Sequence, residues 1–256
     1  MRRVACVFAH PDDDTFGVGG SLALHAQDEL ELTVILATSG EAGRIADASL
    51  ATRGELGMVR EAEDLASWRA LGLEPDVRFL RHPDGGLGQL PRQGLVEQLR
   101  SIFEELAPEV VVTFGPDGIT GHPDHVAIGA AATDAFDTAT ADGPGAFLLH
   151  VAIAARDLDL LNQGLRVRGL QPIDSTQPFM PRPVPDEEIG VRVDCSGMLD
   201  RKLEALRAHK TQSELEDLPF DLWPDLLATE AFVVALPERS PGDPVATDLL
   251  ALSPAS

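Results

Sequence analysis

Two short clusters of histidine and aspartate stand out in this sequence, because each follows directly on an apolar run. The first is His-Pro-Asp-Asp-Asp at residues 10–14, after the apolar residues 4–9. The second is Gly-His-Pro-Asp-His at residues 121–125, shortly after the apolar residues 110–114. Two imidazoles and a carboxylate are a common ligand set for Zn²⁺ or Fe²⁺, with positions left open for water and substrate. If the two clusters meet in space, they predict a metal site.

The ionisable residues of the clusters divide into expected metal ligands and acid–base groups. His10 and Asp13 are three residues apart, a spacing that a tight turn can aim at one ion. The second cluster needs to supply only one histidine: His125 opens the following helix, while His122 lies one turn earlier and can reach the far side of a substrate. Asp12 cannot easily bind the same ion as its neighbour, because adjacent side chains diverge. A spare carboxylate beside a metal-bound water is what a general base requires.

Two residues keep more than one interpretation. Asp14 either orients a histidine ligand as a hydrogen-bond acceptor or is simply solvated. His122, taken alone, also fits a helix N-cap followed by proline at the first helical position.

Short buried strands alternate with helices along most of the chain, which predicts an α/β protein with a parallel sheet. We expect strands at residues 4–9, 32–38, 77–80, 110–114, 146–154, 190–193 and 231–236. We expect helices at residues 18–27, 51–71, 94–106, 125–138 and 199–209. If the first four strands have the common order 3-2-1-4, the loops after the first and fourth strands face one crevice, where ligands bind in open α/β sheets. The two clusters lie on those two loops.

We read the 256 residues as one domain: residues 1–140 form the core with the metal site, 141–240 a C-terminal elaboration, and 241–256 a tail expected to be poorly ordered. The net charge of −22 disfavours nucleic acid and anionic membranes as partners. Solubility explains this acidity most simply, and a functional acidic patch is the alternative. The stretch before His10 is too short for a signal peptide, and Cys6 and Cys195 lie in apolar strands, so we expect a cytoplasmic protein with reduced thiols. The oligomeric state stays open, with a homo-oligomer among the options.

With these residues in view, the chain resembles the PIG-L/LmbE family of metal-dependent N-acetylglucosaminyl deacetylases, which includes the deacetylases of mycothiol and bacillithiol synthesis. Both histidine clusters carry the resemblance, and weaker similarities extend over most of the chain, at residues 38–43, 60–63, 71–72, 83–85 and 208–212. The resemblance implies a Rossmann-like open, mostly parallel sheet with helices on both faces and a C-terminal third that decorates it.

The resemblance also implies roles for single residues. His10, Asp13 and His125 correspond to zinc ligands, with Fe²⁺ as the other option, and Asp12 to the base that activates the metal-bound water. His122 corresponds to a group that, as imidazolium, stabilises the oxyanion or protonates the leaving amine. At positions that contact the sugar in characterised relatives, this chain has Arg60 and Asp84; for Arg60 a surface salt bridge with Glu63 or Asp64 is the alternative. The sequence departs from some relatives at Thr120, where they have a tyrosine, and it contains no tyrosine at all.

The expected reaction is removal of the N-acetyl group from an N-acetylglucosamine-type sugar or its conjugate. A family amidase acting on a non-sugar or thiol-conjugate amide is the nearest alternative. A non-haem Fe(II) oxygenase would use the same ligand set but leaves Asp12 and His122 unexplained, and a non-catalytic sugar-binding relative would be expected to lack at least one of the five site residues. A dinucleotide-binding domain fails because Leu22 stands at the third glycine position of its fingerprint. Specificity is expected to reside in the loops at residues 81–92 and 170–185.

Overall fold

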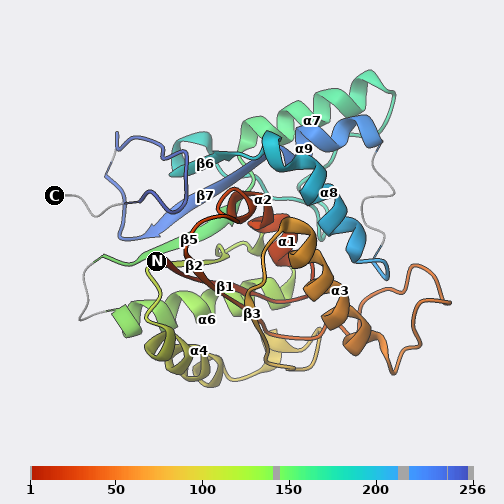
Figure 1. Cartoon of the computed structure of the whole chain (residues 1–256). Coiled ribbons are helices and arrows are strands. Elements are labelled where there is room, and N and C mark those ends of the chain that lie inside the picture. The colour runs from red at the N-terminus through yellow and green to blue at the C-terminus, as the bar shows by residue number, and fades with distance from the viewer. Residues whose placement is uncertain (1, 141–144, 213–218, 241, 253–256) are drawn as a thin grey trace.

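The computed structural model describes residues 2–140, 145–212, 219–240 and 242–252. These residues form a seven-stranded sheet in the order β3-β2-β1-β4-β5-β7-β6 (Figure 1). The strands are β1 Arg2–Phe8, β2 Leu30–Leu36, β3 Asp76–Phe79, β4 Val110–Phe114, β5 Phe147–Ala152, β6 Val191–Asp194 and β7 Thr229–Leu236. The first five pair in parallel, and β7 runs antiparallel to both β5 and β6. The open, mostly parallel sheet and the expected order 3-2-1-4 are both confirmed.

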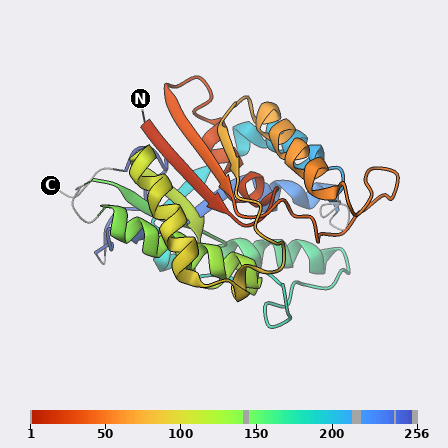
Figure 2. The same ribbon diagram turned by 90° about the horizontal axis from the view of Figure 1, so that it is seen from below.

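Helices cover both faces of the sheet. The α-helices of the described residues are α1 Asp13–Gly17, α2 Gly19–Ala23, α3 Leu56–Leu71, α4 Arg92–Leu106, α5 Gly118–Gly121, α6 Pro123–Thr140, α7 Ala155–Val167, α8 Leu199–Ala208 and α9 Trp223–Leu227. Short 3₁₀ turns lie at Leu87–Gln89, Asp186–Glu188, Ser196–Met198 and Phe220–Leu222. Helices α4 and α6 pack on one face, and α1, α2, α3 and α8 lie over the other (Figures 1 and 2). None of the described helices is long and apolar enough to cross a membrane.

The central strands are apolar along their length because both of their faces are covered. All five residues of β4 are buried, as are the last five of β1 and of β2. This continuous burial is what a parallel sheet between two helix layers requires. Strands β1 and β4 pair directly, and beyond that pairing the rings of Phe8 and Phe114 lie 5.1 Å apart. The chain therefore leaves both strands at the same edge of the sheet.

The helices depart from expectation in several places, and the short helices α5 and α9 were not predicted. The expected helix at residues 18–27 is instead the pair α1 and α2, since the chain turns helical at Asp13 and is interrupted at Val18, whose φ is −146°. Acidic residues in the first turn favour this earlier start through the helix dipole. Helix α3 begins at Leu56 rather than at residue 51, and it ends as expected at Gly72, which adopts a left-handed conformation. Helix α7 was not predicted, although Leu158, Leu161 and Leu165 form a buried stripe on it.

Part of the C-terminal tail packs on the domain. Leu249 and Leu250 are buried in the main core, and Ala246 pairs with Val191 beside the sheet. Of the tail that we expected to be poorly ordered, residue 241 and residues 253–256 lie outside the described part of the chain.

Gly129 lets helix α6 approach strand β4 closely, and this contact fixes the helix that carries His125. A Cβ atom at this position would lie 2.6 Å from the backbone oxygen of Phe114. We expect Gly129→Ala to lower the free energy of unfolding by about 1–3 kcal/mol, as overpacking does, measured by chemical denaturation. Gly94→Ala on α4 is the matched control, because a Cβ there meets nothing within 4 Å. Equal stability of the two variants would contradict the close approach.

Candidate metal and acid–base site

The loops after β1 and β4 bring the three predicted metal ligands together. His10 Nδ1 lies 3.3 Å from Asp13 Oδ2 and 3.3 Å from His125 Nε2. His125 Nε2 lies 3.3 Å from the other carboxylate oxygen, Asp13 Oδ1. In a tetrahedral site with bonds of about 2.0–2.1 Å, ligand atoms stand roughly 3.3–3.4 Å apart. The spacing of these donor atoms therefore fits one small divalent ion.

Hydrogen bonds orient both imidazoles for this task. His125 Nδ1 lies 3.0 Å from the backbone oxygen of Gly118, to which it donates. His10 Nε2 lies 3.0 Å from Asp84 Oδ1 and 3.5 Å from Asp124 Oδ2, so its N–H points at two carboxylates. These partners leave the lone pairs of His10 Nδ1 and His125 Nε2 facing each other beside Asp13. A metal-bound histidine is typically oriented by such a second hydrogen bond.

The electrostatics of the cluster favour a cation. Burial lowers the pKa of His10, but its hydrogen bonds with Asp124, Asp13 and Asp84 outweigh burial and hold that pKa well above the usual value. Burial alone would raise the pKa of Asp13, yet His125 and His10 hold it well below its usual range. Carboxylates thus surround His10 closely enough to retain positive charge there. A divalent ion supplies that charge while His10 gives up its proton.

His122 lies close enough to be considered as a ligand too, but its ring is held in another way. Nitrogen atoms of His10, His122 and His125 all lie within 4.8 Å of one another. His122 Nδ1 accepts the backbone N–H of Asp124 at 3.2 Å, so the residue does cap helix α6 as its sequence context suggested. Burial, and then His10 and His125, lower the pKa of His122. A neutral His122 with Nδ1 occupied as an acceptor carries its proton on Nε2, where it can donate a hydrogen bond.

Asp12 is held by a buried arginine in an unusual backbone conformation. Its φ is 107°, a left-handed value that costs a non-glycine residue about 1–3 kcal/mol and that occurs preferentially at functional sites. Arg60 Nη2 donates to Asp12 Oδ2 at 2.8 Å and to the backbone oxygen of Pro11 at 2.6 Å, and Nη1 donates to Gly40 at 3.0 Å. The surface salt bridge considered for Arg60 is wrong, since its side chain is buried and pairs with Asp12. Arg60 therefore positions the expected base.

Asp84 and Asp124 hold His10 at Nε2, the ring nitrogen that faces away from Asp13. Asp84 also accepts the backbone N–H of Ala42, while Asp124 accepts those of Gly85 and Leu87. Asp84 was expected to contact a sugar, and the structure places it on His10 while it still lines the cavity. Asp124 was not singled out, although it stands within the second histidine cluster.

We expect Asp84→Asn to weaken metal binding by about 10–100-fold, because the amide is a poorer acceptor for His10 Nε2–H. Competition titration of the metal against a chromogenic chelator measures this change. Asp76→Asn on β3 is the matched control, since Asp76 is exposed and contacts Arg78 at 2.8 Å, away from the site. An unchanged affinity in Asp84→Asn would show that His10 needs no carboxylate partner.

Asp14 turns away from the site, so neither role considered for it is correct. It is fully buried and accepts hydrogen bonds from the indole of Trp68 at 2.6 Å and from the backbone of Thr15 at 2.9 Å. Burial is the main cause that raises its pKa to about 6. The neighbouring Asp64 is also buried, and burial followed by the charge of Asp14 raises its pKa well above the usual value. Asp14 therefore links α1 to α3 through Trp68.

A cavity of about 520 Å³ opens over the cluster, a typical size for a ligand pocket. Most of its lining residues have polar side chains, among them His10, Asp12, Arg60, Asp84, His122 and Gln212. Both loops that were expected to hold specificity reach it, through Asp84 and Gly85 in one and through Phe179 in the other. Phe179 lies with its ring 5.7 Å from that of His122.

An open α/β sheet that brings two histidines and a carboxylate together with Asp12 and His122 beyond the carboxyl ends of β1 and β4 is an arrangement typical of metal-assisted hydrolases. Residues 5–136 match the family described as PIG-L, GlcNAc-PI de-N-acetylase. The chain is 34% identical over 273 residues to a 1D-myo-inositol 2-acetamido-2-deoxy-α-D-glucopyranoside deacetylase of Saccharomonospora viridis, covering 95% of this chain and 97% of that one. The chain belongs to the PIG-L family, and its function is that of an N-deacetylase acting on an acetylated amino sugar or its conjugate.

Solved structures support the fold. The N,N′-diacetylchitobiose deacetylase of Pyrococcus horikoshii superposes with a TM-score of 0.61 at 24% identity, covering 91% of this chain and 83% of that one. GalB, a 4-carboxy-2-hydroxymuconate hydratase of Pseudomonas putida, superposes with a TM-score of 0.63 at 17% identity, covering 94% and 98%. Since a hydratase shares the fold, the fold alone does not decide the reaction. The similarity to curated deacetylases decides it.

Proposed function

We propose that the chain is a zinc-dependent N-deacetylase, with Fe²⁺ as the alternative ion, in which His10, Asp13 and His125 hold the metal. The observation that carries this proposal is the set of 3.3 Å separations between the donor atoms of these three residues. An ion held there would supply Lewis-acid chemistry, lowering the pKa of a water molecule and polarising an amide carbonyl.

The residues of the chain then divide the proton transfers between them. Asp12, oriented by Arg60, takes a proton from the attacking water. His122 donates a hydrogen bond from Nε2 to the oxyanion that forms on the amide oxygen. Asp12 returns its proton to the amide nitrogen, so that the C–N bond breaks to give acetate and a free amine.

Oxyanion stabilisation has to proceed without a tyrosine. Thr120 stands where some relatives of the family have one, and it lines the cavity as a half-buried residue. His122 lies in the same cavity, and its pKa is lowered. The lowered pKa favours a neutral hydrogen-bond donor over the imidazolium that the resemblance implies. We therefore assign the oxyanion hydrogen bond to His122.

The substrate proposed is a glucosamine derivative acetylated on nitrogen and joined to a small polar group. The polar walls of the cavity support a sugar, and the curated relative from Saccharomonospora viridis is named for an inositol conjugate. The buried, unpaired thiols of Cys6 and Cys195 support the proposal that the protein works in the reducing cytoplasm.

Acetate release from a panel of N-acetylglucosamine conjugates tests this function. The panel contains free N-acetylglucosamine, its α-linked inositol conjugate, and a simple N-acetyl alkylamine without a sugar. We expect the inositol conjugate to give the highest kcat/KM. Hydrolysis of the alkylamine at an equal or higher kcat/KM would instead support a general amidase.

A further inference from the structure

A second cavity adjoins the polar one at the site. It measures about 340 Å³, and both cavities are lined by Asp13, Phe16, Thr120 and His125. The walls that belong to the second cavity alone are largely apolar. They include Gly17, Phe114, Ile119, Val151, Ile153 and Leu226. The proposed metal ligands Asp13 and His125 therefore stand where a polar chamber and an apolar chamber meet.

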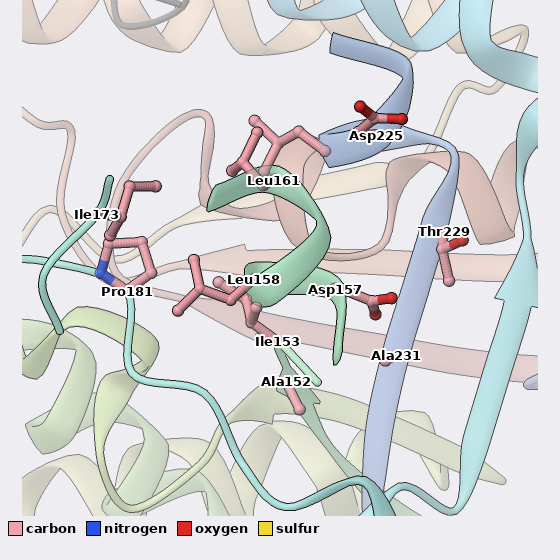
Figure 3. A pocket seen from close by; sticks show the side chains of 11 residues that line it. Ala152, Ile153, Asp157, Leu158, Leu161, Ile173, Pro181, Asp225, Thr229 and Ala231 are labelled. Atoms are coloured by element: carbon pink, nitrogen blue, oxygen red, sulfur yellow. The ribbon is translucent and has the colours of Figure 1, made fainter. Parts of the chain in front are cut away.

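A smaller space of about 70 Å³, which His125 does not line, adjoins the apolar chamber, and we call it the outer space. The two spaces share wall residues, namely Ala152, Ile153, Pro181, Leu226, Thr229 and Ala231. Figure 3 shows this outer space, with Leu158 and Leu161 of α7 on one side and Thr229 and Ala231 of β7 on another. We refer to the two adjoining spaces as the apolar path, of which His125 lines only the inner part.

Beyond the proposed ligand Asp13, the charged groups along this path are neutralised within the protein, except for Asp225, which is exposed at the wall of the outer space. Buried Lys202 forms an ion pair with Glu230 and also donates to the backbone oxygen of Phe16 at 3.0 Å. Asp157, in the outer part, is bound by the two terminal nitrogens of Arg192 at 2.7 and 2.6 Å. A ligand in the path is therefore not required to supply a charge, and an uncharged apolar chain satisfies it.

An amide substrate has two arms, and the two chambers differ in the chemistry they offer to each. The polar chamber contains Asp12, Arg60 and His122 and suits the sugar on the amine side. With the carbonyl carbon beside Asp13 and His125, the acyl arm points into the apolar chamber. Acetate has a single methyl group, which leaves most of this chamber unfilled.

We propose that the apolar chamber is a subsite for the acyl chain and that the enzyme hydrolyses N-acyl amino sugars with linear chains longer than acetyl. This inference rests on the proposed function, because it uses the same amide position and the same acid–base groups. Water adds a hydroxyl group to the acyl carbon and a proton to the nitrogen, so the products are a fatty carboxylic acid and the amine, with no other reactant.

A chain-length series on one sugar tests the subsite. The substrates are the N-acetyl, N-butanoyl, N-hexanoyl and N-octanoyl derivatives of glucosamine. Burial of each added methylene in an apolar chamber is worth about fourfold in binding, so we expect kcat/KM to rise from acetyl to hexanoyl. We also expect hexanoate to inhibit more strongly than acetate. Inhibition by these acids measures binding to the chamber without turnover.

Ala152→Phe places a ring where the two parts of the path meet, and it is expected to lower the ratio of hexanoyl to acetyl kcat/KM at least tenfold. Leu160→Phe is the control. Leu160 lies on α7, as do Leu158 and Leu161 of the outer space, but it is 51% exposed and lines neither part of the path. If Ala152→Phe fails to fold, the comparison of hexanoate with acetate on the parental protein still decides the question.

Three results would overturn the subsite. The first is efficient acetyl hydrolysis with a tenfold loss at butanoyl and no preference for hexanoate, which leaves the proposed function intact. The second is a kcat/KM that rises with the length of the alkyl group in alkyl glycosides of N-acetylglucosamine but not with the length of the acyl group. That result would put the aglycone in the apolar chamber. The third is hydrolysis of none of the N-acyl sugars, which would remove the proposed function as well.

Discussion

Replacing Asp12 by alanine is expected to lower kcat by about 10²–10⁴-fold while the metal stays bound, the usual cost of removing a general base. The effect should be large because the other carboxylates near the cluster are committed elsewhere. Asp84 and Asp124 accept hydrogen bonds from backbone N–H groups and face His10 Nε2. Steady-state acetate release, with metal content measured on the same samples, checks this expectation.

Two companion variants separate base chemistry from loss of structure. Asp12→Asn keeps an oxygen that can accept from Arg60 and should be nearly as slow as Asp12→Ala, because an amide cannot take a proton. Asp134→Ala is the matched control: it removes a half-exposed carboxylate that pairs with Arg92, and such surface pairs contribute little. A parental rate in Asp12→Ala with the metal retained would remove Asp12 from the role of base.

Apolar patterning was enough to predict the sheet, because its central strands are buried on both faces. Residues 110–114 were predicted as a strand and β4 has the same bounds, since continuous burial produces a continuous apolar run. The strand order had to be assumed, and the pairing of β1 with β2 and β4, together with that of β2 with β3, establishes it. The start of α1 was missed because Asp13 opens that helix from inside the acidic cluster, where helix and turn compositions look alike.

Residue type and position in the chain indicated the ligands but not the groups that orient them. His10, Asp13 and His125 sit in two compact motifs, so their meeting followed from the topology. Arg60 lies 48 residues from Asp12 in sequence and in a different element, and nothing in its own neighbourhood indicates that contact. Asp14 shows the converse case. Its place beside the proposed ligand Asp13 suggested a role in the site, but the first turn of α1 directs its side chain toward Trp68.

Removing the metal with a chelator is expected to lower kcat by about 10²–10³-fold or more, because such an ion supplies several kcal/mol of transition-state stabilisation. Adding back one equivalent of Zn²⁺ should restore the activity. The affinity should also depend on pH in a defined direction. The pKa of His10 is raised well above its usual value, and the ring must lose its Nδ1 proton to bind an ion. Affinity should therefore fall about tenfold for each pH unit below that raised pKa and level off above it.

His125→Ala removes one donor of the proposed site and is expected to lose the metal, whereas His25→Ala should bind it like the parental protein. His25 is a suitable control because it is also paired with carboxylates, at 2.7 Å to Asp28 and 3.0 Å to Asp248, but lies outside the cavity. Isothermal titration with Zn²⁺ and with Fe²⁺ under anaerobic conditions compares the two ions on the same three proteins. Full metal binding by His125→Ala would assign the second imidazole ligand to His122, whose nitrogen lies within 4.8 Å of His10. In that case His122 could not also donate to the oxyanion, and Thr120 would be the next side chain of the cavity to test in that role.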